Sequence, residues 1–264
     1  MKWLEMTSQE LEKSVKDCKG VCVVPMGCSE AHGNHMPLGT DLINIEGMVS
    51  RAAQKEPVVE FPAYLFTQIH CAKHMPGTIA TGASVMWDML ESICSEISRN
   101  GFKKIVFVNG HGGNNNLLSY FSQMRLERRY DYVLYSYKNG QYPVDFTDPE
   151  WQKMRQARNI SHGGEEETSI MMYIRPELVK MQHIQKKVRQ RLERFSHLKD
   201  ISTGVSWYAA NPDHYQGDAE LSSKEKGKFL INKAASRLAK AFQIIKKDKV
   251  APEVLREFYG MAGL

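Results

Sequence analysis

The sequence has no long hydrophobic run. Its 264 residues are 42% hydrophobic and 25% charged, but no stretch reaches the roughly 18 to 20 apolar residues that span a bilayer. The first residues, MKWLEMTSQELEKSVKD, lack the apolar core of a secretory signal peptide. They predict an amphipathic helix instead, since Thr7 and Glu10 have the spacing of a capping box. We therefore expect a cytoplasmic protein with no membrane partner.

Cysteine is scarce, and its spacing excludes two classes of protein. The five cysteines are an odd number and form no CxxC pair, which argues against a disulfide framework and against a structural zinc site. Cys28 lies near the site proposed below, but nothing in the sequence marks it as a nucleophile. The net charge of +5 is modest, and its basic runs form no recognisable nucleic-acid module. We expect no nucleic-acid partner.

Two common catalytic motifs are also absent. No GxxxxGK[ST] segment is present, which excludes a Walker-type phosphate loop. No GxSxG elbow is present either, which excludes the usual serine hydrolase nucleophile.

Short apolar runs alternate with amphipathic segments, which predicts a single α/β domain over residues 1–264. No repeat or linker marks a domain boundary. Strands of a mostly parallel sheet are expected at 21–26, 63–69, 104–108 and 131–137. Helices are expected from a cap at Ser84 to residue 100, from the NGHGGN segment to about residue 127, and along an apolar stripe over 230–245. The aromatic segment 138–157 is expected to form a lid or a subunit contact.

Three polar segments hold most of the candidate chemistry. The first, EAHGNHMPLGTD at residues 30–41, directly follows the first strand. Glu30 and His32 are two residues apart and point the same way in extended chain, and the Gly and Pro residues let the backbone turn so that Asp41 returns to them. Carboxylate with imidazole suits Zn, Mn or Fe better than calcium. The alternative is a polar loop in which the carboxylates only cap helices.

The second segment, NGHGGN at residues 109–114, follows the strand at 104–108. Ligands of open parallel sheets bind beyond the carboxyl ends of strands. His111, between glycines, is therefore a candidate metal ligand or base. Asn114 is a candidate for substrate contact or support of the ligands, as is His74.

The third segment, SHGGEEETS at residues 161–169, combines a histidine with three glutamates at the predicted start of a helix. The glutamates could simply form a charged first turn, which the helix dipole favours. One of them turned inward would add a carboxylate ligand. His162 would then be free to donate and accept protons, with Glu165, or else Glu166, orienting it.

These segments resemble the creatininase (creatinine amidohydrolase) family. MGCSEAHGNHMPLGTD is similar to the family pattern P-x-G-[SC]-x-E-x-H-G-x-H-L-P-x-x-T-D, NGHGGN occurs unchanged, and SHGGEEETS resembles H-A-G-x-x-E-T-S. HMPGTI at residues 74–79 resembles a fourth segment, H-x-x-F-P-G-T-I, shortened by one residue. The four segments come in the family's order and span about residues 24–170.

The resemblance implies a three-layer α/β/α sandwich and a homo-oligomer, with a hexamer favoured. It also implies two divalent metal ions per subunit, Zn and/or Mn with Fe as an alternative. Glu30, Asp41 and His111 match the ligands of one ion, and His32, a bridging Asp41 and Glu167 match those of the other. His162 matches the catalytic histidine.

The chain departs from creatininase itself at two places. Gly112 and Gly113 stand where creatininase has an aromatic residue and a glutamate ligand, and no tryptophan lies shortly before His162. These departures argue against creatinine as the substrate.

The predicted function is hydrolysis of a C–N bond in a cyclic amide, amidine or formamide of a small polar molecule, by metal-activated water with His162 as proton shuttle. One alternative is a formamide deformylase or peptide-processing member of the same family. Others are a metal-binding protein that has kept the fold and lost turnover, and a zinc-stabilised structural subunit.

Overall fold

A computed structural model describes residues 1–140, 142–158, 161–185 and 191–264. Its sheet has four parallel strands in the order β2-β1-β3-β4. The strands are β1 (Val21–Met26), β2 (Val59–Glu60), β3 (Lys104–Asn109) and β4 (Val133–Ser136). In the central pair, Val21 lies opposite Lys104 and Met26 opposite Asn109, so β1 and β3 end side by side.

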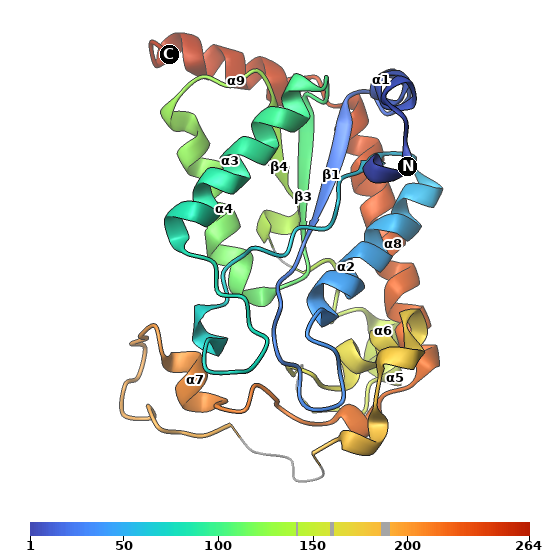
Figure 1. Cartoon of the computed structure of the whole chain (residues 1–264), viewed down its shortest axis with the longest axis vertical. Helices are drawn as coiled ribbons and strands as arrows, with labels where there is room; N and C mark the ends of the chain where they lie inside the picture. The colour runs from blue at the N-terminus through green and yellow to red at the C-terminus, as the bar shows by residue number, and fades with distance from the viewer. Residues whose placement is uncertain (141, 159–160, 186–190) are drawn as a thin grey trace.

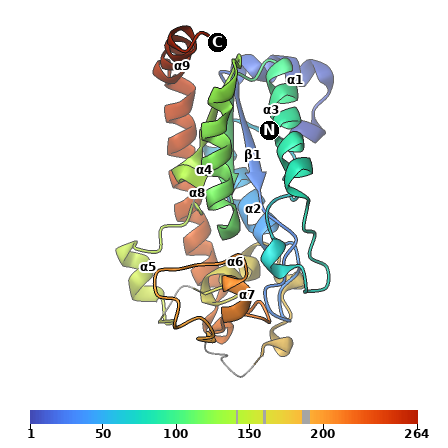
Figure 2. The same ribbon diagram turned by 90° about the vertical axis from the view of Figure 1, so that its left-hand side faces the viewer.

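Helices cover both faces of this sheet (Figures 1 and 2). Their bounds are α1 (Ser8–Asp17), α2 (Thr40–Lys55), α3 (Ala83–Arg99), α4 (Asn115–Met124), α5 (Pro149–Met154), α6 (Glu165–Ile174), α7 (Ser206–Ala210), α8 (Lys224–Lys247) and α9 (Val250–Met261). α2, α6 and α8 form one core with the strand residues Val23 and Val106, while α3 and α4 form another with Val24 and Phe107. Alternate side chains of each strand therefore enter opposite cores, and the predicted three-layer α/β/α architecture is confirmed.

Most of the predicted elements are present. The strand expected at 21–26 has the same bounds as β1, and all six of its residues are buried. Thr7 and Glu10 form the predicted capping box of α1. The predicted cap at Ser84 is wrong, because α3 begins at Ala83 and Ser84 lies inside its first turn; Gly82 occupies the N-cap position, without a side-chain cap hydrogen bond.

The strand predicted at 63–69 is wrong. The residues that pair beside β1 are Val59 and Glu60, and within 63–69 only Tyr64 makes an isolated bridge, to Met26. Tyr64 already lies opposite the last residue of β1, so the chain beyond it has no strand to pair with. It runs past the end of the sheet, where Thr67 donates a hydrogen bond to the Gly27 carbonyl.

Part of the aromatic segment predicted as a lid or subunit contact packs against the core. Trp151 is fully buried in the core of α2 and α8, and Tyr142 and Phe146 pack against that core. Trp151 is therefore a core residue, while a lid or subunit-contact role for the rest of the segment stays a prediction. Residue 141 within this region, residues 159–160 just after it, and residues 186–190 lie outside the described residues.

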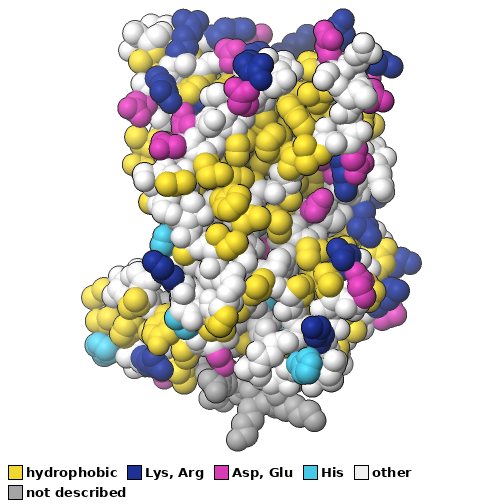
Figure 3. Space-filling model, in the orientation of Figure 1, with side chains coloured by type: hydrophobic (Ala, Val, Ile, Leu, Met, Phe, Trp, Pro, Cys, Tyr) yellow, Lys and Arg dark blue, Asp and Glu magenta, His cyan; other side chains and the backbone are white. Residues whose placement is uncertain are grey.

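The two ends of the molecule differ. On the face in Figure 3, charged side chains gather at the end that carries α9, and a patch of apolar side chains lies in the middle. The opposite end, beyond the carboxyl ends of β1 and β3, holds α5, α6 and α7 (Figure 1).

No helix among the described residues is long and apolar enough to cross a membrane.

Candidate metal centre

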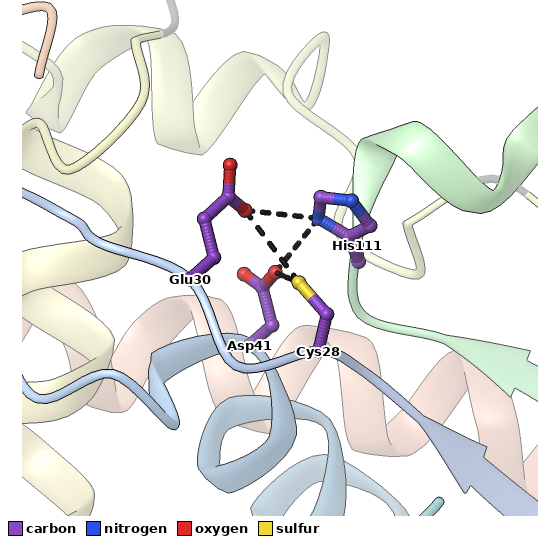
Figure 4. A group of neighbouring side chains, drawn as sticks. All are labelled: Cys28, Glu30, Asp41 and His111. Carbon is purple, nitrogen blue, oxygen red and sulfur yellow. Dashed lines mark hydrogen bonds and ion pairs between the residues drawn. The ribbon is translucent and has the colours of Figure 1, made fainter. Parts of the chain in front are cut away.

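Two strand ends and the first turn of α2 bring Glu30, Asp41 and His111 together (Figure 4). His111 Nδ1 lies 3.1 Å from Glu30 Oε2 and 2.8 Å from Asp41 Oδ2. Two glycines allow this approach. A Cβ on Gly27 would lie 2.7 Å from the Leu42 nitrogen, and one on Gly110 would lie 2.6 Å from the Asp41 carbonyl oxygen. Backbone atoms cannot yield at such distances, so these positions require glycine.

A second group of ligand atoms shares Asp41. His32 Nε2 lies 3.0 Å from Asp41 Oδ1 and 3.7 Å from Glu167 Oε2. The two oxygens of Asp41 therefore face two different histidines. Glu167 projects from the first turn of α6, and the Gly163 amide donates a 2.8 Å hydrogen bond to its Oε2. The ligand atoms of His32, Asp41 and Glu167 all lie within 4.8 Å of one another.

The protonation of these groups reflects the close carboxylates. Burial alone would lower the pKa of His32, but Asp41 and Glu167 outweigh it and raise the pKa to about 10. Burial also acts to lower the pKa of His111. Glu30, followed by Cys28 and Asp41, outweighs this effect, and the pKa of His111 lies well above its ordinary value. Burial would raise the pKa of Asp41, yet His32 and His111 hold it below its ordinary value. Positive charge is thus strongly favoured between these side chains.

A divalent cation meets the same electrostatic demand as those protons. In the described part of the chain, no lysine or arginine forms an ion pair with Glu30, Asp41 or Glu167. His32 Nδ1 lies 3.1 Å from the Glu30 carbonyl oxygen, which can only accept, so Nδ1 carries a proton and Nε2 can face a cation. Buried carboxylate and imidazole donors of this kind fit Zn, Mn or Fe.

His162 stands beside both groups. Its Nε2 lies 2.8 Å from the Ala31 carbonyl oxygen, so this nitrogen donates and Nδ1 is left as the basic nitrogen of the neutral ring. Its ring centroid is 4.1 Å from that of His32. Burial, followed by the nearby His32, lowers the pKa of His162 below its ordinary value. The ring is therefore neutral near pH 7, ready to accept a proton.

The site opens into a cavity of about 450 Å³. Glu30, Asp41, His111, His162 and Glu167 contribute to its lining. The remaining wall consists of small, polar and aromatic residues, namely Gln68, Cys71, Gly112, Gly113, Thr203, Gly204 and Trp207. A small polar molecule could therefore reach both ligand groups and His162 together.

Comparison with known proteins identifies the family. Residues 4–242 match the family profile for creatininase, described as creatinine amidohydrolase. The chain belongs to the creatininase family. It is 26% identical over 192 residues to creatinine amidohydrolase of Pseudomonas putida, covering 68% of this chain and 74% of that protein. It is 31% identical over 183 residues to the mycofactocin precursor peptide peptidase of Mycolicibacterium smegmatis, covering 65% of this chain and 63% of that protein.

Solved creatininase structures have the same fold. A crystal structure of creatinine amidohydrolase superposes with a TM-score of 0.78 at 21% identity, covering 94% of this chain and 98% of that chain. A manganese form of creatininase gives 0.78 at 22% identity, with coverages of 94% and 99%. A mutant creatininase of the Zn-Zn type is equally similar, with a TM-score of 0.78.

Three of the residues expected at this creatininase-family site have other partners. Glu165 accepts hydrogen bonds from the Gln156 and Ala157 amides and forms an ion pair with Lys226, with no contact to His162. Its expected role in orienting His162 therefore has no support in the geometry. His74 bonds to the Pro212 carbonyl, 2.6 Å away. The Asn114 side chain accepts from the backbone amide of Gln68 and donates to Asn109 Oδ1, which also accepts from the His111 backbone amide, so Asn114 contacts the loop that carries His111.

Three residues at the site escaped the sequence analysis or had no role in it. His214 is fully buried, and its Nδ1 lies 3.2 Å from Glu30 Oε1. Trp207 places its ring 5.6 Å from that of His162, measured between centroids. Both come from a segment far along the chain with no recognisable motif. Cys28 could have been assigned, because it lies two residues before Glu30 and its sulfur is 3.2 Å from Asp41 Oδ2.

Proposed function

We propose that this creatininase-family hydrolase cleaves a C–N bond in a cyclic amide, amidine or formamide of a small polar molecule. The observation that carries the proposal is the sharing of Asp41 between two groups of ligand atoms, with His162 beside both at the edge of the cavity. The likeness to creatinine amidohydrolase of Pseudomonas putida supports the reaction class.

Two divalent ions, Zn and/or Mn or else Fe, are proposed for each subunit. Glu30, Asp41 and His111 would hold one, and His32, Asp41 and Glu167 the other. When bound, such ions supply an activated water and polarise the carbonyl or amidine carbon under attack. The Zn-Zn and Mn forms of solved creatininases support this choice of metals.

His162 is proposed to move the proton. Its Nε2–H is held by the Ala31 carbonyl, so Nδ1 is the nitrogen that accepts a proton and passes it to the departing nitrogen of the substrate. The lowered pKa of His162 keeps that nitrogen free near neutral pH. Trp207 packs edge-on against the ring and limits its rotation. Gln68, on the cavity wall, can hold a polar group of the substrate.

A second candidate is hydrolysis of a formamide or of a peptide substrate by the same centre. The 31% identity to the mycofactocin precursor peptide peptidase favours it, because that relative matches the chain over 183 residues. A metal-binding protein that has lost turnover is a further alternative. Homo-oligomer formation, with a hexamer favoured, and a cytoplasmic location stay predictions.

The test combines metal analysis with a hydrolysis screen over cyclic amides, amidines, formamides and peptides. His111→Ala should lose bound metal and activity together. Removing a residue that only supports a ligand lowers metal affinity by roughly 10- to 100-fold, and removing a direct ligand should lower it further. His162→Asn should keep the metal and lower kcat by about 10²- to 10⁴-fold. Full metal content with normal turnover in His111→Ala would refute the assignment. Metal binding without hydrolysis of any substrate class would favour the non-catalytic alternative.

A further inference from the structure

The Cys28 side chain points into the first group of ligand atoms (Figure 4). Its sulfur lies 3.2 Å from Asp41 Oδ2 and 3.6 Å from Glu30 Oε2. The ligand atoms of Cys28, Glu30, Asp41 and His111 all lie within 4.8 Å of one another, and all four residues are buried. Glu30, Asp41 and His111 make up one proposed metal position, so Cys28 adds a fourth donor to it.

The sulfur-to-oxygen spacing in this group is close to the spacing of ligand atoms around a zinc ion. Bond lengths of about 2.3 Å to sulfur and 2.0 to 2.1 Å to nitrogen and oxygen put neighbouring ligand atoms roughly 3.3 to 3.5 Å apart. The separations from sulfur to the two carboxylate oxygens are 3.2 and 3.6 Å. Those from His111 Nδ1 to the same oxygens, 3.1 and 2.8 Å, are shorter and lie within hydrogen-bond range.

A network of hydrogen bonds alone explains this arrangement poorly. A thiol carries one proton, yet the Cys28 sulfur faces an oxygen of Glu30 and an oxygen of Asp41. His111 Nδ1 also carries at most one proton and faces the same two oxygens. The two protons can serve two of these four contacts, whereas one central cation would face all four atoms at once.

We infer that Cys28 is the fourth ligand of the ion held by Glu30, Asp41 and His111, bound through its thiolate. The thiol proton is displaced by the cation and passes to the solvent, so coordination changes no oxidation state. This inference rests on the metal centre of the proposed function and adds a ligand that the proposed set of residues lacks.

The consequence is a difference between the two metal positions. A thiolate selects Zn over Mn, whereas carboxylate and imidazole accept either metal. The position with Cys28 therefore prefers Zn. The position formed by His32, Asp41 and Glu167 has only oxygen and nitrogen donors, and it accepts Mn more readily.

Cobalt substitution tests the ligand directly. The full chain loaded with Co²⁺ should show a thiolate-to-cobalt charge-transfer band in the near ultraviolet. Cys28→Ser should lose this band while still binding cobalt, and its preference for Zn over Mn should fall by roughly 10-fold or more. The matched control is Cys71→Ser, which removes the thiol that also lines the cavity and should keep the band.

The outcomes separate this inference from the proposed function. Bound cobalt without the band, or a band that survives in Cys28→Ser, overturns the thiolate ligand and leaves the hydrolase proposal standing. Failure of the wild-type chain to bind cobalt or zinc overturns both. If Cys28→Ser does not fold, X-ray absorption of the zinc-loaded Cys71→Ser protein decides. A sulfur shell at about 2.3 Å supports the inference, and its absence overturns it.

Discussion

Two regions bury carboxylates in contrasting ways. Glu165 is fully buried at the start of α6, and Lys226 of α8 supplies its positive charge. Glu30 and Asp41 are almost as deeply buried. Among the described residues, however, their side-chain partners are histidines and Cys28, and no lysine or arginine pairs with them. A buried carboxylate with its own lysine needs nothing further. A group of buried carboxylates without one is arranged to receive a cation.

Removing Glu165 should give the largest loss of stability. Glu165→Ala leaves the Lys226 ammonium buried with only the Gln156 side chain and the Leu221 carbonyl as partners. Breaking a buried pair in this way costs about 3 to 5 kcal/mol in free energy of unfolding. Urea denaturation would measure the loss, and metal analysis of the folded fraction should show unchanged content.

The control for this variant removes both charges. Glu165→Gln combined with Lys226→Met should cost less than Glu165→Ala, because no unpaired charge is left inside. A Glu165→Ala protein of normal stability that had lost its metal would instead place Glu165 in the metal centre, and the contrast between the two regions would fail.

Metal should stabilise the folded chain only through the site of Glu30 and Asp41, which has no lysine partner. Zinc at 100 times its dissociation constant should raise the free energy of unfolding by about 2.7 kcal/mol, since it binds the folded chain. Asp41→Asn should abolish this gain, because both groups of ligand atoms use Asp41. Thermal unfolding with and without zinc would measure it. Glu165→Gln serves as the matched variant and should keep the gain; an equal gain in Asp41→Asn would contradict the proposed ligands.

The sequence predicted the sheet where burial alone decides the pattern. β1 and β3 are continuous apolar runs because helices cover both of their faces, and this pattern is visible without coordinates. The segment 63–69 has a similar composition but lies beyond the end of β1, with a single bridge at Tyr64. Composition cannot indicate whether a neighbouring strand extends far enough to pair.

The candidate site was predictable where its residues form motifs. Glu30, Asp41 and His111 follow strands that end side by side, so their convergence follows from a parallel sheet. The three consecutive glutamates could not be assigned in this way. Their directions depend on the placement of α6 against α8, which turns Glu165 toward Lys226 while Glu167 faces His32. His214 was missed because only the path of a long loop brings it to Glu30.

His35 shows a third way to bury an ionisable group, which is to keep it neutral. It lies three residues after His32, but its Nε2 bonds to the Thr168 hydroxyl 2.9 Å away and no carboxylate is its partner among the described residues. Burial, followed by the nearby His32, lowers the pKa of His35 to about 4. The same residue type thus titrates oppositely at two neighbouring positions, since carboxylates raise the pKa of His32.

This difference predicts the smallest of the three effects, on stability in mild acid. Between the unfolded pKa near 6.5 and the folded pKa near 4, the unfolded chain binds a proton that folded His35 refuses, so stability falls as pH falls through this window. His35→Gln cannot titrate. Between pH 7 and pH 5 its free energy of unfolding should therefore drop by about 1 to 2 kcal/mol less than that of the wild type. Urea denaturation at both pH values would measure the difference. Equal drops in the two proteins would mean that His35 binds a proton as readily in the folded chain as in the unfolded chain. Burial without a carboxylate would then be too weak to keep this imidazole neutral.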